Sequence, residues 1–258
     1  MKSEDNDEVS RYRRYREAWY TDNQPASMAL QEQSMNITHL KLRFSNAYLL
    51  SGRKTVIVDT GMPGEEGNIL RAAERAGVRR EDITLIVHTH GHVDHAGSTA
   101  ALVKTLGVPT AVHRADEGML RAGKMNPLSP LRLEARLILP LVNKPFPSVA
   151  PDLLVDESVD LSAYGIEGRI LHTPGHTAGS ISILLPDGAA IVGDVMMGGY
   201  MGGNLLGTRP NDHYFAEDLD AVHASIRALL QAGVTTFYVG HGGPLQRAAV
   251  EQRFARHI

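Results

Sequence analysis

Residues 86–98 read IVHTHGHVDHAGS, and the six residues from His90 to His95 include three histidines and one aspartate. The whole chain has 12 histidines. An imidazole carries one hydrogen-bond donor and one acceptor that burial would leave to be satisfied, so this crowding is unusual for an ordinary core. In an extended loop, residues two apart share a face, so His90 and His92 can bind one cation while Asp94 and His95 turn toward another.

The residues around this loop predict where it lies in the fold. DITLIVH (residues 82–88) is a nearly continuous apolar run, which is typical of a strand buried on both faces. Before it, residues 41–52 and 55–64 resemble adjacent strands, and residues 65–77 have helical spacing that ends on Gly77. A strand, helix, strand order predicts a crossover unit whose ligand-binding groups lie at the carboxyl end of the strand. The histidine loop occupies that place.

Further metal ligands must come from elsewhere, because a catalytic zinc generally keeps three protein ligands and one open position. The chain contains no cysteine, so His, Asp and Glu are the only strong ligand types available. His176 in TPGHTAG, Asp194 in IVGD and His241 in YVGHGG each follow a strand-like run and have glycine neighbours. These three are the next candidates.

Taken in order, these motifs resemble the metallo-β-lactamase superfamily of hydrolases. The match covers roughly residues 46–243: VDTG with Asp59, THGHVDH at 89–95, TPGHTAGS with His176, GD with Asp194 and GHG with His241. The resemblance implies an α/β fold, the four-layer αββα sandwich of that superfamily with a helical insertion. It also implies a dinuclear metal centre with Asp59 in a supporting role beside the ligand loop. Its implied ligands are His90, His92 and His176 for the first metal, Asp94, His95 and His241 for the second, and Asp194 bridging both.

Two divalent metal ions are therefore the expected cofactors. Zinc is the first choice, and iron or manganese remain open because they use the same ligand types. A water shared by two cations loses a proton near neutral pH and becomes a metal-bound hydroxide nucleophile. Asp94 is the candidate catalytic residue, because it could orient that hydroxide and move its proton to the leaving group.

Departures from the known members of the superfamily narrow the substrate. An aspartate at the bridging position, Asp194, argues against a true β-lactamase. Glyoxalase II matches the metal motifs but carries a helical domain after its last histidine, for which the stretch after His241 is too short. Acyl-homoserine lactonases place a tyrosine three residues after the bridging aspartate, where this chain has Met197, with Tyr200 one turn further on.

The leading prediction is a hydrolase of a small ester, thioester or lactone. Residues 117–149, rich in Leu, Met and Pro, would form an inserted helical lid around an apolar acyl pocket. For His213 and Tyr214 the sequence is equally consistent with a surface loop and with a loop that faces the substrate. A mononuclear iron centre of the persulfide dioxygenase type, an oxidoreductase, is the chief alternative, and a metal-bearing binding protein with little turnover is the third.

The composition fits one domain over residues 1–258, with 43% hydrophobic residues. A net charge of −3 gives no case for nucleic acid or an anionic membrane as partner, and no signal-peptide pattern is present, so a cytoplasmic protein with a small-molecule substrate is expected. Residues 1–36 form a predicted arm whose aromatic residues pack on the domain or on the second subunit of a homodimer. Four histidines are predicted to be core residues: His88, His113, His172 and His223.

Overall fold

The computed structural model describes residues 35–258, so the predicted N-terminal arm lies almost wholly outside the described residues. The first sheet has six strands in the order β1-β2-β3-β4-β5-β6. Strands β1 to β3 are antiparallel, and β3 to β6 run parallel to one another. The strands are β1 (Asn36–Lys41), β2 (Asn46–Ser51), β3 (Thr55–Val58), β4 (Ile83–Val87), β5 (Thr110–His113) and β6 (Leu153–Val155).

The second sheet also has six strands, in the order β14-β13-β10-β9-β8-β7. Only β10 and β13 are parallel neighbours in it. A two-stranded hairpin, β11 (Met197–Tyr200) and β12 (Leu205–Asn211), follows β10. The sheet strands are β7 (Ser158–Asp160), β8 (Arg169–His172), β9 (Ile181–Leu184), β10 (Ala189–Gly193), β13 (Thr236–Val239) and β14 (Leu245–Gln246).

The main apolar core lies between the two sheets. Side chains alternate along a strand, so Tyr48 and Leu50 of β2 face this layer while Leu49 between them faces outward. On the other side, Ile183 of β9 and Ile191 of β10 belong to the same core cluster. Both sheets are therefore apolar on both faces, which requires a further layer outside each of them.

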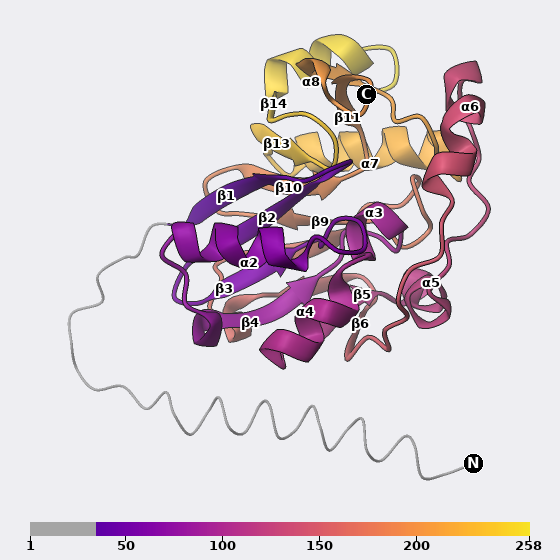
Figure 1. Cartoon of the computed structure of the whole chain (residues 1–258). Coiled ribbons are helices and arrows are strands. Elements are labelled where there is room, and N and C mark those ends of the chain that lie inside the picture. The colour runs from indigo at the N-terminus through magenta and orange to yellow at the C-terminus, as the bar shows by residue number, and fades with distance from the viewer. Residues whose placement is uncertain (1–34) are drawn as a thin grey trace. The chain divides into compact units, whose positions relative to one another are not determined.

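Helices supply those outer layers (Figure 1). Helices α2 (Glu66–Arg75) and α4 (Thr99–Leu106) pack on the outer face of the first sheet through Ile69 and Leu102. Helices α7 (Leu219–Gln231) and α8 (Arg247–Phe254) cover the second sheet through Ile226 and Phe254. The predicted four-layer αββα sandwich is confirmed.

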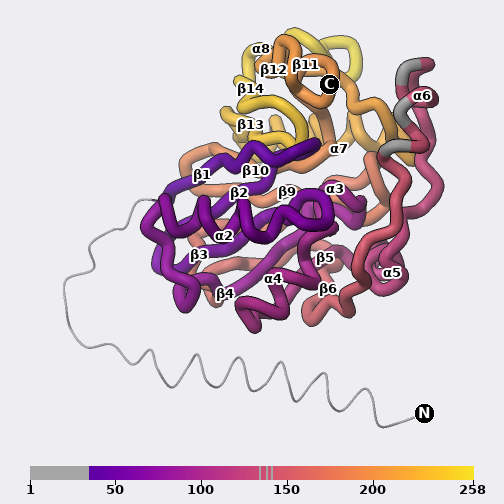
Figure 2. Tube along the Cα trace, in the orientation of Figure 1, coloured from indigo at the N-terminus to yellow at the C-terminus, as the bar shows by residue number. Residues whose placement is uncertain are grey.

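Residues 117–149 contain α5 (Glu117–Ala122) and α6 (Leu133–Val142), and Figure 2 follows the chain from α5 through α6 to β6. Leu120 and Phe146 pack under the histidine loop against Val93, whereas Leu133 and Leu137 of α6 are 74% and 76% exposed. Two helices thus occupy the predicted insertion, and its function as a lid stays a prediction. The remaining short elements are α3 (Val93–Ala96), η1 (Arg80–Asp82), η2 (Arg114–Asp116) and η3 (Ser162–Tyr164).

None of the helices within residues 35–258 is both long and apolar enough to cross a membrane.

Candidate metal centre

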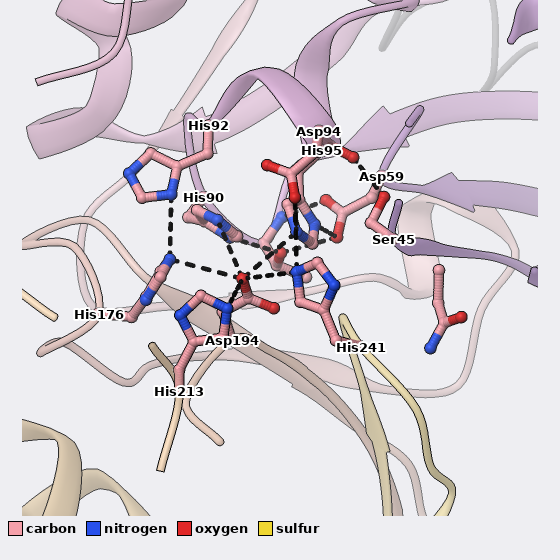
Figure 3. A network of polar contacts seen from close by, with 12 residues as sticks. Ser45, Asp59, His90, His92, Asp94, His95, His176, Asp194, His213 and His241 are labelled. Atoms are coloured by element: carbon pink, nitrogen blue, oxygen red, sulfur yellow. Dashed lines mark hydrogen bonds and ion pairs between the residues drawn. The ribbon is translucent and has the colours of Figure 1, made fainter. Parts of the chain in front are cut away.

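All seven residues proposed as ligands lie together in one cluster of side chains (Figure 3). They come from segments that directly follow strands β4, β8, β10 and β13. The loop after β4 supplies the largest share, and the short helix α3 turns two of its members toward a second point. The residues are His90 and His92 of the loop, Asp94 and His95 of α3, His176 after β8, Asp194 after β10 and His241 after β13.

Asp194 is at the centre of the cluster. Its Oδ2 atom is a near neighbour of five imidazoles, four of them from proposed ligands and the fifth from His213, and its side chain is only 2% exposed. Two groups of possible ligands, His90–His92–His176 and Asp94–His95–His241, each have their ligand atoms within 4.8 Å of one another. The distances from Asp194 Oδ2 to the Nε2 atoms are 3.8 Å for His90, 3.5 Å for His95, 3.5 Å for His176 and 3.3 Å for His241.

Three ligand atoms of this cluster have no hydrogen-bond partner within residues 35–258. Among the described residues, five buried side-chain nitrogen or oxygen atoms have no hydrogen-bond partner, and three of them are His90 Nε2, His95 Nε2 and Asp194 Oδ1. Such orphaned atoms are costly unless something else satisfies them. Imidazole nitrogens and carboxylate oxygens are suitable ligands for zinc and related divalent cations, so these residues fit a metal centre.

Hydrogen bonds fix which imidazole nitrogen faces the cluster. Four of the ligand histidines place Nδ1 beside an anchoring oxygen, so that in the neutral ring, the form that binds a metal, the lone pair on Nε2 faces the cluster. His92 is the exception, because its Nδ1 faces inward, 3.0 Å from His176 Nε2. The anchors are Thr89 Oγ1 for His90 (3.1 Å), Asp59 Oδ2 for His95 (2.8 Å), the Phe215 carbonyl for His176 (2.9 Å) and the Phe44 carbonyl for His241 (2.8 Å).

Asp59 supports the ligand loop from the end of β3. Its Oδ1 accepts a hydrogen bond from the Thr89 amide at 2.8 Å, and its Oδ2 accepts one from the Thr89 hydroxyl at 2.7 Å. The backbone of Asp59 has a φ of 62°, a left-handed conformation that costs free energy outside glycine and is found at constrained functional positions. Asp59 therefore holds both the loop and the His95 ring.

Asp116, at the end of η2, holds the loops that carry the first ligand group, as Asp59 holds the histidine loop and His95. The sequence did not predict this residue. Its Oδ2 accepts hydrogen bonds from the Gly91 amide and the Thr177 hydroxyl, both at 2.8 Å, and its Oδ1 accepts one from the Gly179 amide at 2.9 Å. It therefore links the loop that carries His90 and His92 to the loop that carries His176. Burial raises the pKa of Asp116 to about 6.

Gly240 shows how closely the backbone approaches the cluster. A Cβ atom at this position would lie 2.0 Å from Asp194 Oδ1 and 2.7 Å from His95 Cε1. No side chain fits there, which explains the glycine before His241 in physical terms.

The two groups differ in their electrostatics. Burial lowers the pKa of His92 to about 4 and that of His176 to about 3, so the first group consists of neutral imidazoles. Burial acts in the same direction on His241, but the Asp194 and Asp94 carboxylates outweigh it and raise its pKa to about 10. The pKa of His95 is raised well above its usual value for the same reason.

The three predicted substrate-facing residues fall into different places. His213 is 11% exposed, and its Nε2 lies 3.3 Å from Asp194 Oδ2, so the structure brings it into the cluster. The Tyr214 hydroxyl accepts a hydrogen bond from the Met201 amide and so fastens the β11–β12 hairpin. Tyr200 ends β11 with 36% exposure, and no contact with the cluster is seen for it in the described part of the chain.

The histidines predicted to be structural lie outside the ligand set. His88 is fully buried, as predicted for a core residue; its Nε2 lies 3.1 Å from the Thr99 hydroxyl, while its Nδ1 has no hydrogen-bond partner among the described residues. His223 is buried in α7 and contacts Asp212 at 3.1 Å. His113 and His172 stack on each other with ring centroids 4.0 Å apart, and His172 is only half-buried.

Comparison with known proteins agrees with this geometry. Residues 40–241 match the metallo-beta-lactamase superfamily. A probable metallo-hydrolase of Methanocaldococcus jannaschii is 33% identical over 152 residues, 59% of this chain and 67% of that protein. A hydroxyacylglutathione hydrolase of Acidiphilium cryptum is 29% identical over 234 residues, 90% of this chain and 76% of that protein. The crystal structure of TTHA1623 in a di-iron-bound form has a TM-score of 0.58 at 26% identity, covering 85% of this chain and 97% of that chain.

The fold and the cluster thus define a metal-dependent hydrolase. The chain belongs to the metallo-β-lactamase superfamily, and both predictions are confirmed.

Proposed function

We propose that this protein is a dinuclear metal hydrolase that cleaves a small ester, thioester or lactone. One observation carries the proposal: Asp194 Oδ2 lies within 3.8 Å of imidazole nitrogens from both ligand groups. A carboxylate in that position can be shared by two cations, whereas a single cation would need only one group. This favours a dinuclear centre over the mononuclear iron centre of the alternative oxidoreductase.

The proposed ligands follow from the two groups. His90, His92 and His176 would hold one cation, and Asp94, His95 and His241 would hold the other. Asp194 would be their common ligand, with Asp59 orienting His95. When bound, two divalent cations supply a nucleophile from water at neutral pH and polarise the scissile carbonyl.

The metal is proposed to be zinc, whose preferred ligands include imidazole and carboxylate. Iron is supported by the di-iron-bound form of TTHA1623, and manganese accepts the same ligand types.

Asp94 is the proposed catalytic residue of the chain. Its side chain is 18% exposed, against 2% for Asp194, so it is the more open of the two cluster carboxylates. Although burial raises its pKa, His95 and His241 outweigh that effect and keep Asp94 ionised. An ionised carboxylate at the opening can accept a hydrogen bond from the attacking water and pass its proton toward the leaving group.

The proposed substrate class rests on the site and on the relatives. Two relatives are named hydroxyacylglutathione hydrolases. An aspartate at position 194 also departs from the pattern that the superfamily resemblance gives for true β-lactamases. The insertion is proposed to shape an apolar acyl pocket, and its residues Leu133 and Leu137 have exposed apolar side chains. A small-molecule substrate and a cytoplasmic location remain part of the proposal.

Elemental analysis coupled to a hydrolysis screen tests the proposal. We expect two metals per chain and turnover of lactones, thioesters or simple esters, with β-lactams and phosphodiesters as comparison substrates. The variant His90→Gln should lose metal and activity, while His88→Gln, two residues earlier in the same stretch, should keep its metal. One iron per chain with oxygen uptake would instead show the oxidoreductase, and an occupied site whose rate is unchanged in Asp94→Ala would show a binding protein.

A further inference from the structure

His213 stands on a segment that is anchored on several sides. Next to it, Asp212 forms an ion pair with Arg253 at 2.7 Å and contacts His223 at 3.1 Å. On its other side, the Tyr214 carbonyl accepts a hydrogen bond from the Leu131 amide at 2.9 Å, which ties the segment to the insertion. An imidazole on such a support is held in place before any ligand arrives, as a catalytic hydrogen-bonding group requires.

The Phe215 peptide determines which nitrogen of His213 carries the proton. His213 Nδ1 lies 3.3 Å from the Phe215 amide and 3.2 Å from the Phe215 carbonyl. That carbonyl already accepts the shorter bond from His176 Nδ1, at 2.9 Å. The amide can only donate, so its contact favours Nδ1 of His213 as the acceptor, while the carbonyl has His176 as its closer donor. In the neutral ring the proton is then on Nε2, which faces the cluster.

His213 lies close enough to His176 and Asp194 to form a possible ligand group with them, but the orientation of its ring separates it from the proposed ligands. His90, His95, His176 and His241 each have Nδ1 beside an anchoring oxygen and turn a lone pair inward. His213 has Nδ1 against an amide donor and turns an N–H inward. Its Nε2 lies 3.3 Å from Asp194 Oδ2, the oxygen that a cation would share.

From this we infer that His213 is a catalytic residue rather than a metal ligand: its Nε2–H donates a hydrogen bond to the carbonyl oxygen of the bound acyl substrate and to the oxyanion that forms from it. The inference rests on the proposed function. With a metal held by Asp194, the Oδ2 atom would no longer be available as an acceptor, and the Nε2–H of His213 would be free for the substrate. A preorganised donor aimed at a developing oxyanion is worth about 10²- to 10³-fold in kcat.

The test compares three variants of the full chain loaded with Co(II), with 4-nitrophenyl acetate and a thioester as probes. His213→Ala should keep the metal content and the visible absorption spectrum of the bound Co(II), while kcat falls about 100-fold and KM changes little. His213→Gln, which restores an N–H donor, should recover part of the loss. His223→Gln removes the other imidazole next to Asp212 and serves as the matched control, with kcat close to that of the unmodified chain.

Three results would overturn the inference. A changed Co(II) spectrum or metal content in His213→Ala would make His213 a ligand. An unchanged kcat in His213→Ala would show that His213 takes no part in the reaction. An equal loss of kcat in His223→Gln would show that the role of His213 is structural. Failure of the proposed function is distinguishable, because the unmodified chain would then hydrolyse neither probe.

Discussion

Asp59 Oδ2 lies 2.8 Å from His95 Nδ1, and the same carboxylate accepts two hydrogen bonds from Thr89. A side chain at the end of β3 therefore fixes both the start of the histidine loop and the ring orientation of its last histidine. Contacts of this kind orient ligands and tune their basicity without touching the metal.

Replacing this carboxylate should affect the second metal more than the first. In Asp59→Asn one acceptor oxygen is lost, so the His95 ring is no longer held with Nε2 facing the cluster. We expect the affinity for the second metal to fall by about 10- to 100-fold, as measured by competition with a chelator. Asp220→Asn, on the exposed start of α7, is the control. Equal affinities in the two variants would refute the role given to Asp59.

Asp116→Asn should instead weaken metal binding by the first ligand group, which consists of His90, His92 and His176. Asparagine offers one carbonyl oxygen where the Gly91 amide, the Gly179 amide and the Thr177 hydroxyl need two acceptor oxygens. Leaving a buried donor without a partner costs about 1–3 kcal/mol, so the free energy of unfolding should fall by that amount in urea titrations. Metal should be lost from the His90–His92–His176 group first. A variant with unchanged stability and metal content would contradict this assignment.

Gly240→Ala should remove metal binding through a steric effect. Its Cβ atom would lie 2.0 Å from Asp194 Oδ1, so the carboxylate must move out of its position between the two groups. Gly118→Ala in α5 meets no atom within 4 Å and is the matched control; it should be stabilising by about 0.5–1 kcal/mol. Elemental analysis and thermal unfolding of both variants check this. Full metal occupancy in Gly240→Ala would be the contrary result.

Metal binding should release protons from the second group and few from the first. Above pH 5 the imidazoles of His92 and His176 are already neutral, because burial lowers their pKa to about 4 and 3. His241, whose pKa the carboxylates raise to about 10 against the effect of burial, is protonated at pH 7 and must lose that proton to bind a cation. Calorimetry in two buffers of different ionisation enthalpy measures the protons released. If protons were released when the metal binds to the first ligand group rather than to the second, the prediction would be contradicted.

Much of the site is predictable from the sequence because its ligands are chemically distinctive and follow strands. His176, Asp194 and His241 stand out as His or Asp residues that follow a strand and have glycine neighbours. The strands before them, β8, β10 and β13, run in the same direction, so their carboxyl ends lie at one edge of the sheet. Asp116 had no such pattern. Its only signal was a carboxylate three residues after a parallel strand, and its function depends on two distant loops that the tertiary fold brings together.

Backbone partners were beyond sequence reasoning for a different reason. The carbonyls of Phe44 and Phe215 orient His241 and His176, yet every residue carries a carbonyl, so residue type gives no indication. The place of His213 was left open because a loop histidine can face either way. Its burial depends on the pairing of its segment with residues 129–131 of the insertion.

The central claim is that two cations share Asp194, and electron paramagnetic resonance of the Co(II)-loaded protein tests it most directly. Titration should saturate at two Co(II) per chain, and the second equivalent should reduce the signal of the first through magnetic coupling. In Asp194→Asn the coupling should disappear. Saturation at one Co(II) per chain, or two uncoupled signals in the unmodified protein, would contradict the account.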